Sequence, residues 1–398
     1  MVVDWGLGEA GRKAIWSLRL RLHSGLRQSG AHPSRMKPRD GWGTRPSRSI
    51  ACRVNREMET IILTMIPPEI ILDRYVKEKF PNGYFGKLNI ERVSSSSLRT
   101  FLDGLQIETN DALRLENANA SGGVVHPPFH FDYLEATVAN AHAIPLAEYW
   151  FIALTLPLVI SIVDVSKDLS RSPIVLQLLH LDSGAMQHPD ILWGYLGQIQ
   201  MLFLTAHEYT HLIHQHSDRK APDGMWTEFV PRIAHGSMES QVEELDADGY
   251  ATYLVLAFLL RSERRERALI QLGRSNLTTG DADELIMSCF FLALMAFFRT
   301  LWPESVRSPL SQLTHPPVPV RIDYVIQIAK MWCGQFDHLE PSWFTSPRLK
   351  HLFHAGISKG NQSHRPGWDA QLSLLKSAGG DQYRNLLFEK ANSLRRRE

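Results

Sequence analysis

Long apolar stretches without helix breakers dominate the chain from about residue 145 onward. The run "HPDILWGYLGQIQMLFLTAHEYTHLIHQH" has Pro189 near its start and ends before the loop-like "SDRKAPDG". A second helix is expected from about Ser240, where Ser240 and Glu243 have the spacing of a capping box, through "DADGYATYLVLAFLLRS". A third is expected at "ELIMSCFFLALMAFF". The pattern therefore predicts a mainly helical core.

Two uncharged runs within this core invite comparison with membrane spans. They cover residues 149–163 and 285–298, and both are shorter than the ~20 apolar residues that a span requires. We interpret them as buried helices. The first belongs to "LAEYWFIALTLPLVISIVDVSKDL", which we expect to form one buried helix, bent at Pro157.

The pattern is mixed on either side of this core. We expect a strand at "YFGKLNIERV", a short capped helix at "SSSSLRTFLDGLQ" and a loop at "NANASGGVVHPPFHFDY". After about Asp337 come loops and the amphipathic stretch "WDAQLSLLKSAGGDQYRNLLFEKANSL". The predicted fold is mainly α with a small β part (α+β). Its predicted regions are an extension at 1–57, a mixed α/β region at 58–144, the core at 145–335 and a helical region at 336–398.

Charge is unevenly distributed along the 398 residues, although the net charge is only +1. Residues 1–57 contain twelve Lys and Arg against four Asp and Glu, so this segment has a net charge of about +8 and the rest of the chain one of about −7. A basic start on an acidic body is typical of a tail rather than of a nucleic-acid-binding domain, so no nucleic acid partner is expected. The tail resembles an organelle presequence in being rich in Arg, but we favour a disordered extension or an upstream segment before a start at Met58 or Met65.

The cysteines favour a reducing compartment. Cys52, Cys289 and Cys333 form no CxxC pair, and their number is odd. We expect free, buried thiols and a cytoplasmic location, and we exclude a zinc site built on cysteine.

The candidate chemistry begins with "HEYTH" at residues 207–211. On a helix, positions i and i+4 point the same way about 6 Å apart, so His207 and His211 could bind one ion through their ring nitrogens. Zn²⁺ suits imidazole and carboxylate ligands. Glu208 lies ~100° around the helix, where a general base for a zinc-activated water belongs. The alternative is a buried helix whose histidines only form hydrogen bonds.

A third ligand is expected from "QVEELDADGYA", which begins about thirty residues after His211. Helix periodicity places Glu244 and Asp248 on the flank of the inward face, and Glu243 and Asp246 toward solvent. We therefore predict that Glu244 binds the metal and that Asp248 accepts a hydrogen bond from a ligand histidine, which fixes the orientation of the ring. The alternative is a solvated acidic helix start.

Three other histidines are not expected to bind this ion. His214 shares the face of His207 and His211 but lies ~10.5 Å along the axis from His207, too far for a shared ion. His126 and His130 fall in loop-like sequence. We assign all three a structural or substrate-side role.

The order of three motifs resembles a known family. HExxH is followed by ExxAD, here Glu244 to Asp248, and then by "THPPVPVRI" at 314–322. This order is similar to that of gluzincin-type zinc metallopeptidases. HtpX-like peptidases carry THPPxxxRI, and Lit-type phage-exclusion peptidases carry THPxxxxRI. The short spacing between the first two motifs and the aromatic-rich "LAEYWFIAL" ahead of them resemble the Lit type more closely. The resemblance covers about residues 145–330.

The resemblance implies a zincin-like helical core and a Zn²⁺-dependent endopeptidase that acts on a protein or peptide substrate. His207, His211 and Glu244 would be ligands, Glu208 the base, and Asp248 an orienting residue. His315 and Arg321 match the downstream motif, so a place near the site or an anchoring role is implied. The Lit likeness also suggests a conditional protease in phage defence. Two alternatives stay open: a membrane-associated quality-control protease and a non-catalytic, zinc-stabilised interaction module.

Overall fold

The computed structural model describes residues 66–80, 82–119, 127–181, 189–216, 237–300, 310, 313, 315–336, 338–357 and 375–395. The predicted extension at 1–57 lies outside the described residues. Helices make up 73% of the residues that can be interpreted, and one small sheet accompanies them. The predicted class, mainly α with a small β part, is therefore confirmed.

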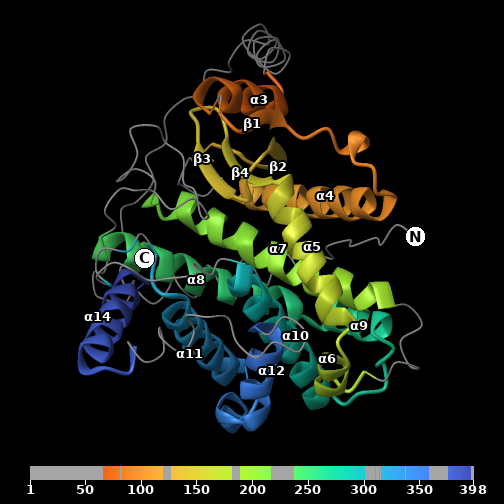
Figure 1. The fold of residues 1–398 in the computed structure, drawn as a ribbon, viewed down its shortest axis with the longest axis vertical. Coiled ribbons are helices and arrows are strands. Elements are labelled where there is room, and N and C mark those ends of the chain that lie inside the picture. Colours follow the sequence, from red (N-terminus) through yellow and green to blue (C-terminus); the bar gives the residue numbers. More distant parts are fainter. Residues whose placement is uncertain are drawn as a thin grey trace, which may run out of the picture.

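The helices and strands follow one another along the chain as shown in Figure 1. The α-helices of the described residues are α3 (Pro68–Lys79), α4 (Ser96–Asn119), α5 (Leu156–Ser170), α6 (Pro173–Leu178), α7 (Pro189–Ile213), α8 (Met238–Leu259), α9 (Ser262–Gln271), α10 (Thr279–Thr300), α11 (Val318–Phe336), α12 (Pro347–Ile357) and α14 (Ala378–Arg395). The strands are β1 (Tyr84–Lys87), β2 (Phe129–Ala136), β3 (Ala141–Pro145) and β4 (Trp150–Thr155).

The four strands form one sheet in the order β1-β2-β4-β3. β2 and β4 are parallel, whereas β1 pairs with β2 and β3 with β4 in antiparallel fashion. Alternate residues of β4 face opposite sides: Phe151 packs in a cluster with Leu72 and Val76 of α3, and Ile152 packs into the main helical core. The sheet thus lies between α3 and the helical body (Figure 1).

The prediction of one buried helix bent at Pro157 is wrong. Residues 150–155 form β4, and α5 begins at Leu156. Both faces of β4 are buried, so the strand reads as a continuous apolar run that periodicity cannot distinguish from a buried helix. Pro157 lies in the first turn of α5, where a missing N–H costs nothing, so it starts the helix instead of bending it.

The mixed region also differs from its prediction. Residues 129–133, expected in a loop, belong to β2, and the helix expected to be short extends over the 24 residues of α4. The predicted boundary between 144 and 145 falls inside the sheet, because β3 ends at Pro145 and pairs with β4. Backbone hydrogen bonds between β3 and β4 therefore join residues on the two sides of the predicted boundary.

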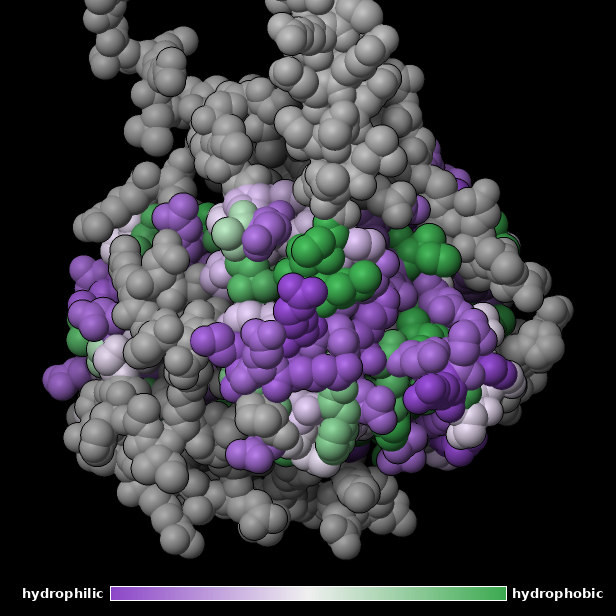
Figure 2. All heavy atoms as spheres, turned by 90° about the horizontal axis from the view of Figure 1, so that it is seen from above, coloured by the Kyte–Doolittle hydropathy of each residue, from purple (hydrophilic) through white to green (hydrophobic). Residues whose placement is uncertain are grey.

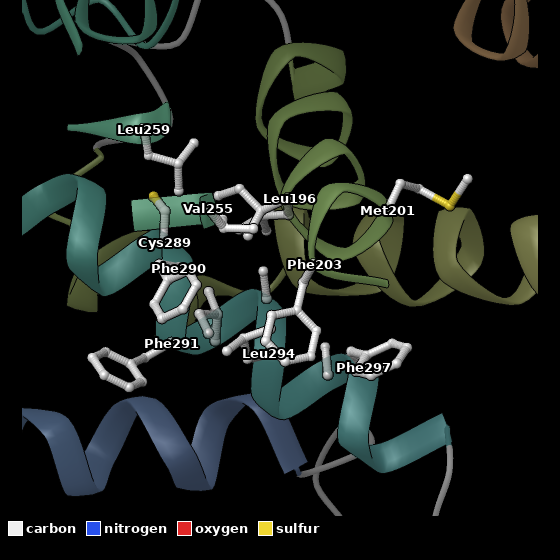
Figure 3. Close-up of a cluster of buried hydrophobic side chains, with 14 of the residues drawn as sticks. Leu196, Met201, Phe203, Val255, Leu259, Cys289, Phe290, Phe291, Leu294 and Phe297 are labelled. Carbon is white, nitrogen blue, oxygen red and sulfur yellow. The ribbon is translucent and has the colours of Figure 1, made fainter. Parts of the chain in front are cut away.

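α7 is the central helix of the body. It packs against α5, α8 and α10. Figure 3 shows apolar side chains that join α7, α8 and α10. Leu196 and Phe203 of α7 meet Val255 of α8 and Leu294 and Phe297 of α10. The site described below is built on α7 and α8, so it rests on the largest apolar cluster of the described residues.

The start of α8 lies earlier than predicted. Ser237 caps the helix, and its side chain accepts a hydrogen bond from the backbone N–H of Ser240, while the Ser240 hydroxyl accepts one from the backbone N–H of Ser237. The capping box is therefore Ser237–Ser240 and not Ser240–Glu243. Ser240 fills the place that Glu or Gln usually takes three residues after the cap, so a search for Glu or Gln there missed the true start.

The described helices can be compared with the requirements of a membrane span. No helix in the described part of the chain combines the length and the apolar composition needed to cross a bilayer. Figure 2 views the molecule from the α3 end, where hydrophilic side chains cover the centre of the described surface and hydrophobic ones gather in a few patches beside them.

Candidate metal centre

His207 and His211 lie one turn apart on α7 and point the same way. Their Nε2 atoms are 3.0 Å apart, and both side chains are buried. The helix is uninterrupted over this stretch, so the i, i+4 spacing alone brings the two nitrogens together. The structure thus places these two predicted ligands side by side.

Glu244 of α8 completes the group. Its Oε2 lies 3.4 Å from Nε2 of His207, and its Oε1 lies 3.7 Å from Nε2 of His211. The carboxylate is buried, and its Oε2 accepts no hydrogen bond. A buried carboxylate oxygen in that state costs free energy unless a cation or donor reaches it. The three residues form a group whose ligand atoms lie within 4.8 Å of one another.

The spacing of these atoms fits zinc. Zn²⁺ binds imidazole nitrogen and carboxylate oxygen at about 2.0–2.1 Å in a tetrahedral shell, so neighbouring ligand atoms are about 3.3 Å apart. The separations of 3.0, 3.4 and 3.7 Å lie on both sides of this value. Two neutral imidazoles and one carboxylate are also a donor set that zinc prefers. The residues therefore fit a zinc ion in both distance and chemistry.

Asp248 lies behind this group, one turn after Glu244. Its Oδ1 is 3.1 Å from Nδ1 of His207, so a proton on Nδ1 would leave the Nε2 lone pair facing Glu244. Arg321 of α11 donates two hydrogen bonds to the same carboxylate, from Nε at 2.7 Å and from Nη2 at 2.8 Å. Burial alone would raise the pKa of Asp248, but the Arg321 charge and these hydrogen bonds lower it below the ordinary value. Of the roles implied for Arg321, the contacts point to anchoring.

Glu208 and His315 lie near the group and differ in their exposure to solvent. Glu208 follows His207 on α7 and is buried beside the group. His315 Nε2 lies 3.7 Å from Oε2 of Glu244, and its side chain is 26% exposed, in contrast to the buried ligands. Of these side chains, His315 is therefore the one open to a molecule arriving from solvent.

The prediction that Glu243 and Asp246 face solvent is wrong. They are 3% and 1% exposed. α11 and α14 pack against α8, and Val242 and Leu245 join a second apolar cluster with residues of those helices. A helix covered on several sides has no solvated face, so the periodicity of its own sequence could not identify the side on which later helices dock.

Asp246 instead contacts two histidines that follow the zinc motif. Nδ1 of His214 lies 2.5 Å, and Nε2 of His216 3.5 Å, from its Oδ2. The structure thus keeps His214 out of the group of His207, as expected from its spacing. His130 lies on β2, 3.7 Å from Asp132, and His126 falls outside the described residues.

His216 is the neighbour of the site that sequence reasoning missed. Its Nδ1 lies 3.0 Å from Nδ1 of His211. On a continuous helix, a residue five positions after His211 would point well away from it. α7 ends at Ile213, however, and Gln215 adopts a positive φ of 54°, which turns the chain back. This turn is hard to predict from the sequence. The left-handed residue that follows a helix is usually Gly or Asn, whereas here it is Gln.

Comparison of the chain with protein-family models, with curated proteins and with solved structures finds no match. The resemblance to gluzincin-type peptidases therefore continues to rest on the three sequence motifs alone.

Proposed function

We propose that this protein is a zinc-dependent endopeptidase. The observation that carries the proposal is the convergence of His207, His211 and Glu244 from two helices, with Glu208 next to them in the first helix. Glu244 follows His211 by 33 residues in the chain, so the fold and not local sequence brings it to the two histidines. A purely structural zinc site has no need of a glutamate beside its ligands.

Zinc bound there would supply a Lewis acid and lower the pKa of water toward about 7. The protein's own groups perform the proton transfers. Glu208 accepts the proton of the attacking water and donates it to the departing amine nitrogen. Asp248 and Arg321 keep the His207 ring in the orientation that presents Nε2 to the group. Burial of Glu208 excludes bulk water from this exchange.

The class of substrate comes from the resemblance of the three motifs to gluzincin-type peptidases, which implies a protein or peptide.

The position of His315 favours a second candidate function, a non-catalytic module stabilised by zinc. His315 is close enough to Glu244 to raise the question of a fourth protein ligand, and four ligands would close the shell as in structural zinc sites. The two functions differ in their expectation for His315→Ala. A catalytic site keeps its zinc affinity within about threefold, whereas a closed structural site loses at least about tenfold. A competition titration with a chromophoric chelator measures the difference.

The cellular setting is a further part of the proposal. Cys289 and Cys333 are free and buried, as expected for a protein of a reducing compartment, so we place the peptidase in the cytoplasm. A role as a conditional protease in phage defence rests on the Lit-type motif order alone.

The test of the proposal is Glu208→Gln. We expect this variant to bind zinc as the wild type does and to lose cleavage of a proteome-derived peptide library by at least about 100-fold, because the amide cannot accept the proton. Glu239→Gln, at an exposed position of α8, is the control and should cleave normally. Cleavage that survives Glu208→Gln, or zinc that is lost with it, would show that Glu208 is not the base.

A further inference from the structure

His216 joins the zinc group to a second cluster of polar side chains. Its Nδ1 lies 3.0 Å from Nδ1 of His211, and its Nε2 lies 3.5 Å from Oδ2 of Asp246. Asp246 also lies 2.5 Å from Nδ1 of His214. His216 and Asp246 are buried, and His214 is partly so. A series of contacts therefore links the proposed zinc ligand His211, through the imidazole of His216, to the buried carboxylate of Asp246.

The second cluster could itself be taken for a metal site. One ligand atom each from His214, His216 and Asp246 lies within 4.8 Å of the others. Two imidazoles and a carboxylate are the same donor set as in the first group. Distances alone therefore allow two zinc ions in adjacent positions.

The tautomers of the histidines decide between one ion and two. A neutral imidazole carries one N–H and one lone pair. If Nε2 of His211 binds zinc, its Nδ1 carries the proton and donates it to Nδ1 of His216. His216 must then carry its own proton on Nε2, which faces Asp246. Under these conditions Nε2 of His216 has no lone pair for a metal.

Filling both sites would require both Nδ1 atoms to carry protons. Two N–H groups would then face each other across the 3.0 Å that separates them, which replaces a hydrogen bond by a repulsive contact. The charge on Asp246 acts in the same direction. A carboxylate stabilises an N–H, and not a lone pair, on the nitrogen that faces it.

We propose that His216, held by Asp246, is a positioning residue that fixes His211 with its Nε2 lone pair toward Glu244, and that the protein binds one zinc ion and not two. This inference rests on the proposed function, since it takes the group of His207, His211 and Glu244 as the zinc site. In this arrangement each ligand histidine is held by a carboxylate of α8. Asp248 contacts His207 directly, and Asp246 holds His211 through His216.

The test compares two replacements of His216 in the full chain, with zinc alone as the probe. Asn keeps an acceptor near the position of Nδ1, whereas Leu keeps most of the volume and has no acceptor. We expect His216→Leu to weaken zinc binding about 10–100-fold, in the range for loss of a group that orients a ligand, and His216→Asn to recover most of it. A residue needed only for packing would give the opposite order. His214→Leu, which leaves the contact between His211 and His216 in place, should weaken binding less than His216→Leu.

Two measurements on the wild type keep the inference testable if a variant does not fold. Metal analysis at zinc excess should give one ion per chain. Nitrogen-15 NMR of the imidazoles in the zinc-loaded chain should show a proton on Nδ1 of His211 and on Nε2 of His216.

The outcomes separate this inference from the proposed function. Two zinc ions per chain, a proton on Nδ1 of His216, or unchanged affinity in His216→Leu while Glu244→Ala loses zinc would overturn the positioning role and leave the peptidase proposal standing. A wild type that binds no zinc would overturn both. One ion, weakened by His216→Leu and restored by His216→Asn, supports the positioning role even if Glu208→Gln retains cleavage and the peptidase proposal fails.

Discussion

At the scale of single residues, Asp248 and Arg321 form a buried ion pair joined by two hydrogen bonds. Both are almost inaccessible to solvent, at 0% and 3% exposure, and the guanidinium also lies over the ring of Phe298. Removing two charges from water is expensive, so such a pair is stable only when both partners and their hydrogen bonds are present. Loss of one partner leaves the other charge buried without compensation.

This asymmetry gives a stability prediction. Arg321→Met should lower the free energy of unfolding by about 3–5 kcal/mol, because the Asp248 carboxylate is left in the core. Arg384→Met is the matched control, since it breaks an ion pair with Asp323 whose partners are 36% and 39% exposed, and it should cost about 0–1 kcal/mol. Urea denaturation of the two variants measures both. Equal losses of unfolding free energy in the two variants would show that the buried pair contributes no more to stability than the exposed one.

Burial also determines the reactivity of two thiols. It raises the pKa of Cys289 to about 12 and that of Cys333 to about 12, with the negative charge of Asp283 adding to the effect at Cys333. In a Cys52→Ser background, we expect the folded protein to show no reaction with a disulfide reagent at pH 8 over an hour, and two thiols per chain after unfolding. Rapid labelling of the native chain would contradict the described packing.

The sequence predicted the site residues best where one regular helix carries them. Helix periodicity placed Glu244 and Asp248 on a common flank, and both lie at the group, with Glu244 beside His211 and His207. It failed for Asp246, whose environment depends on helices that dock from elsewhere in the chain. It made no prediction for His216, which reaches the site only because the helix ends and the chain turns back.

At the scale of elements, the contact between α10 and α12 depends on a glycine. A Cβ atom added to Gly356 would lie 2.5 Å from Cβ of Met295 and 3.1 Å from the backbone oxygen of Leu292. Both neighbours belong to α10, and one of them is backbone, which cannot rotate away. The two helices therefore pack at a distance that only glycine allows.

The corresponding prediction compares two alanine substitutions. Gly356→Ala should destabilise the protein by about 1–3 kcal/mol, as overpacked cores do. Gly104 lies within α4 with no atom within 4 Å of an added Cβ, so Gly104→Ala should stabilise the protein by about 0.5–1 kcal/mol through helix propensity alone. Thermal unfolding should show shifts of opposite sign. A shift of the same sign in both would contradict the close approach of α12 to α10.

The element scale also shows where sequence patterns stop being informative. Long helices with clear ends, such as α7 and α10, were predicted from apolar runs bounded by Pro189 or by polar segments. β4 was taken for a helix because both of its faces are buried, and β2 for a loop because Gly and Pro precede it. Strand pairing is a long-range property, and a single segment does not contain it.

At the scale of the whole molecule, the proposed zinc site connects two helices of the main core. His207 and His211 come from α7 and Glu244 from α8, and both helices pack into the cluster that includes α5 and α10. An unfolded chain does not hold three ligands in this arrangement, so a metal that binds here stabilises the folded state.

Zinc removal should therefore lower the melting temperature of the entire chain. At a free zinc concentration about 1,000 times the dissociation constant, binding contributes about 4 kcal/mol. We expect a chelator to lower the melting temperature by several degrees, zinc to restore it, and the Glu244→Ala variant to respond to neither. A chelator effect of equal size in Glu244→Ala would place the stabilising ion elsewhere.

The central claim is that His207, His211 and Glu244 hold one zinc ion, and anomalous scattering at the zinc absorption edge from a crystal of the zinc-loaded protein tests it most directly. Our account predicts a single strong peak within about 2.0–2.2 Å of Nε2 of His207, Nε2 of His211 and a carboxylate oxygen of Glu244. The absence of any peak there, or a peak among His214, His216 and Asp246 instead, would contradict it.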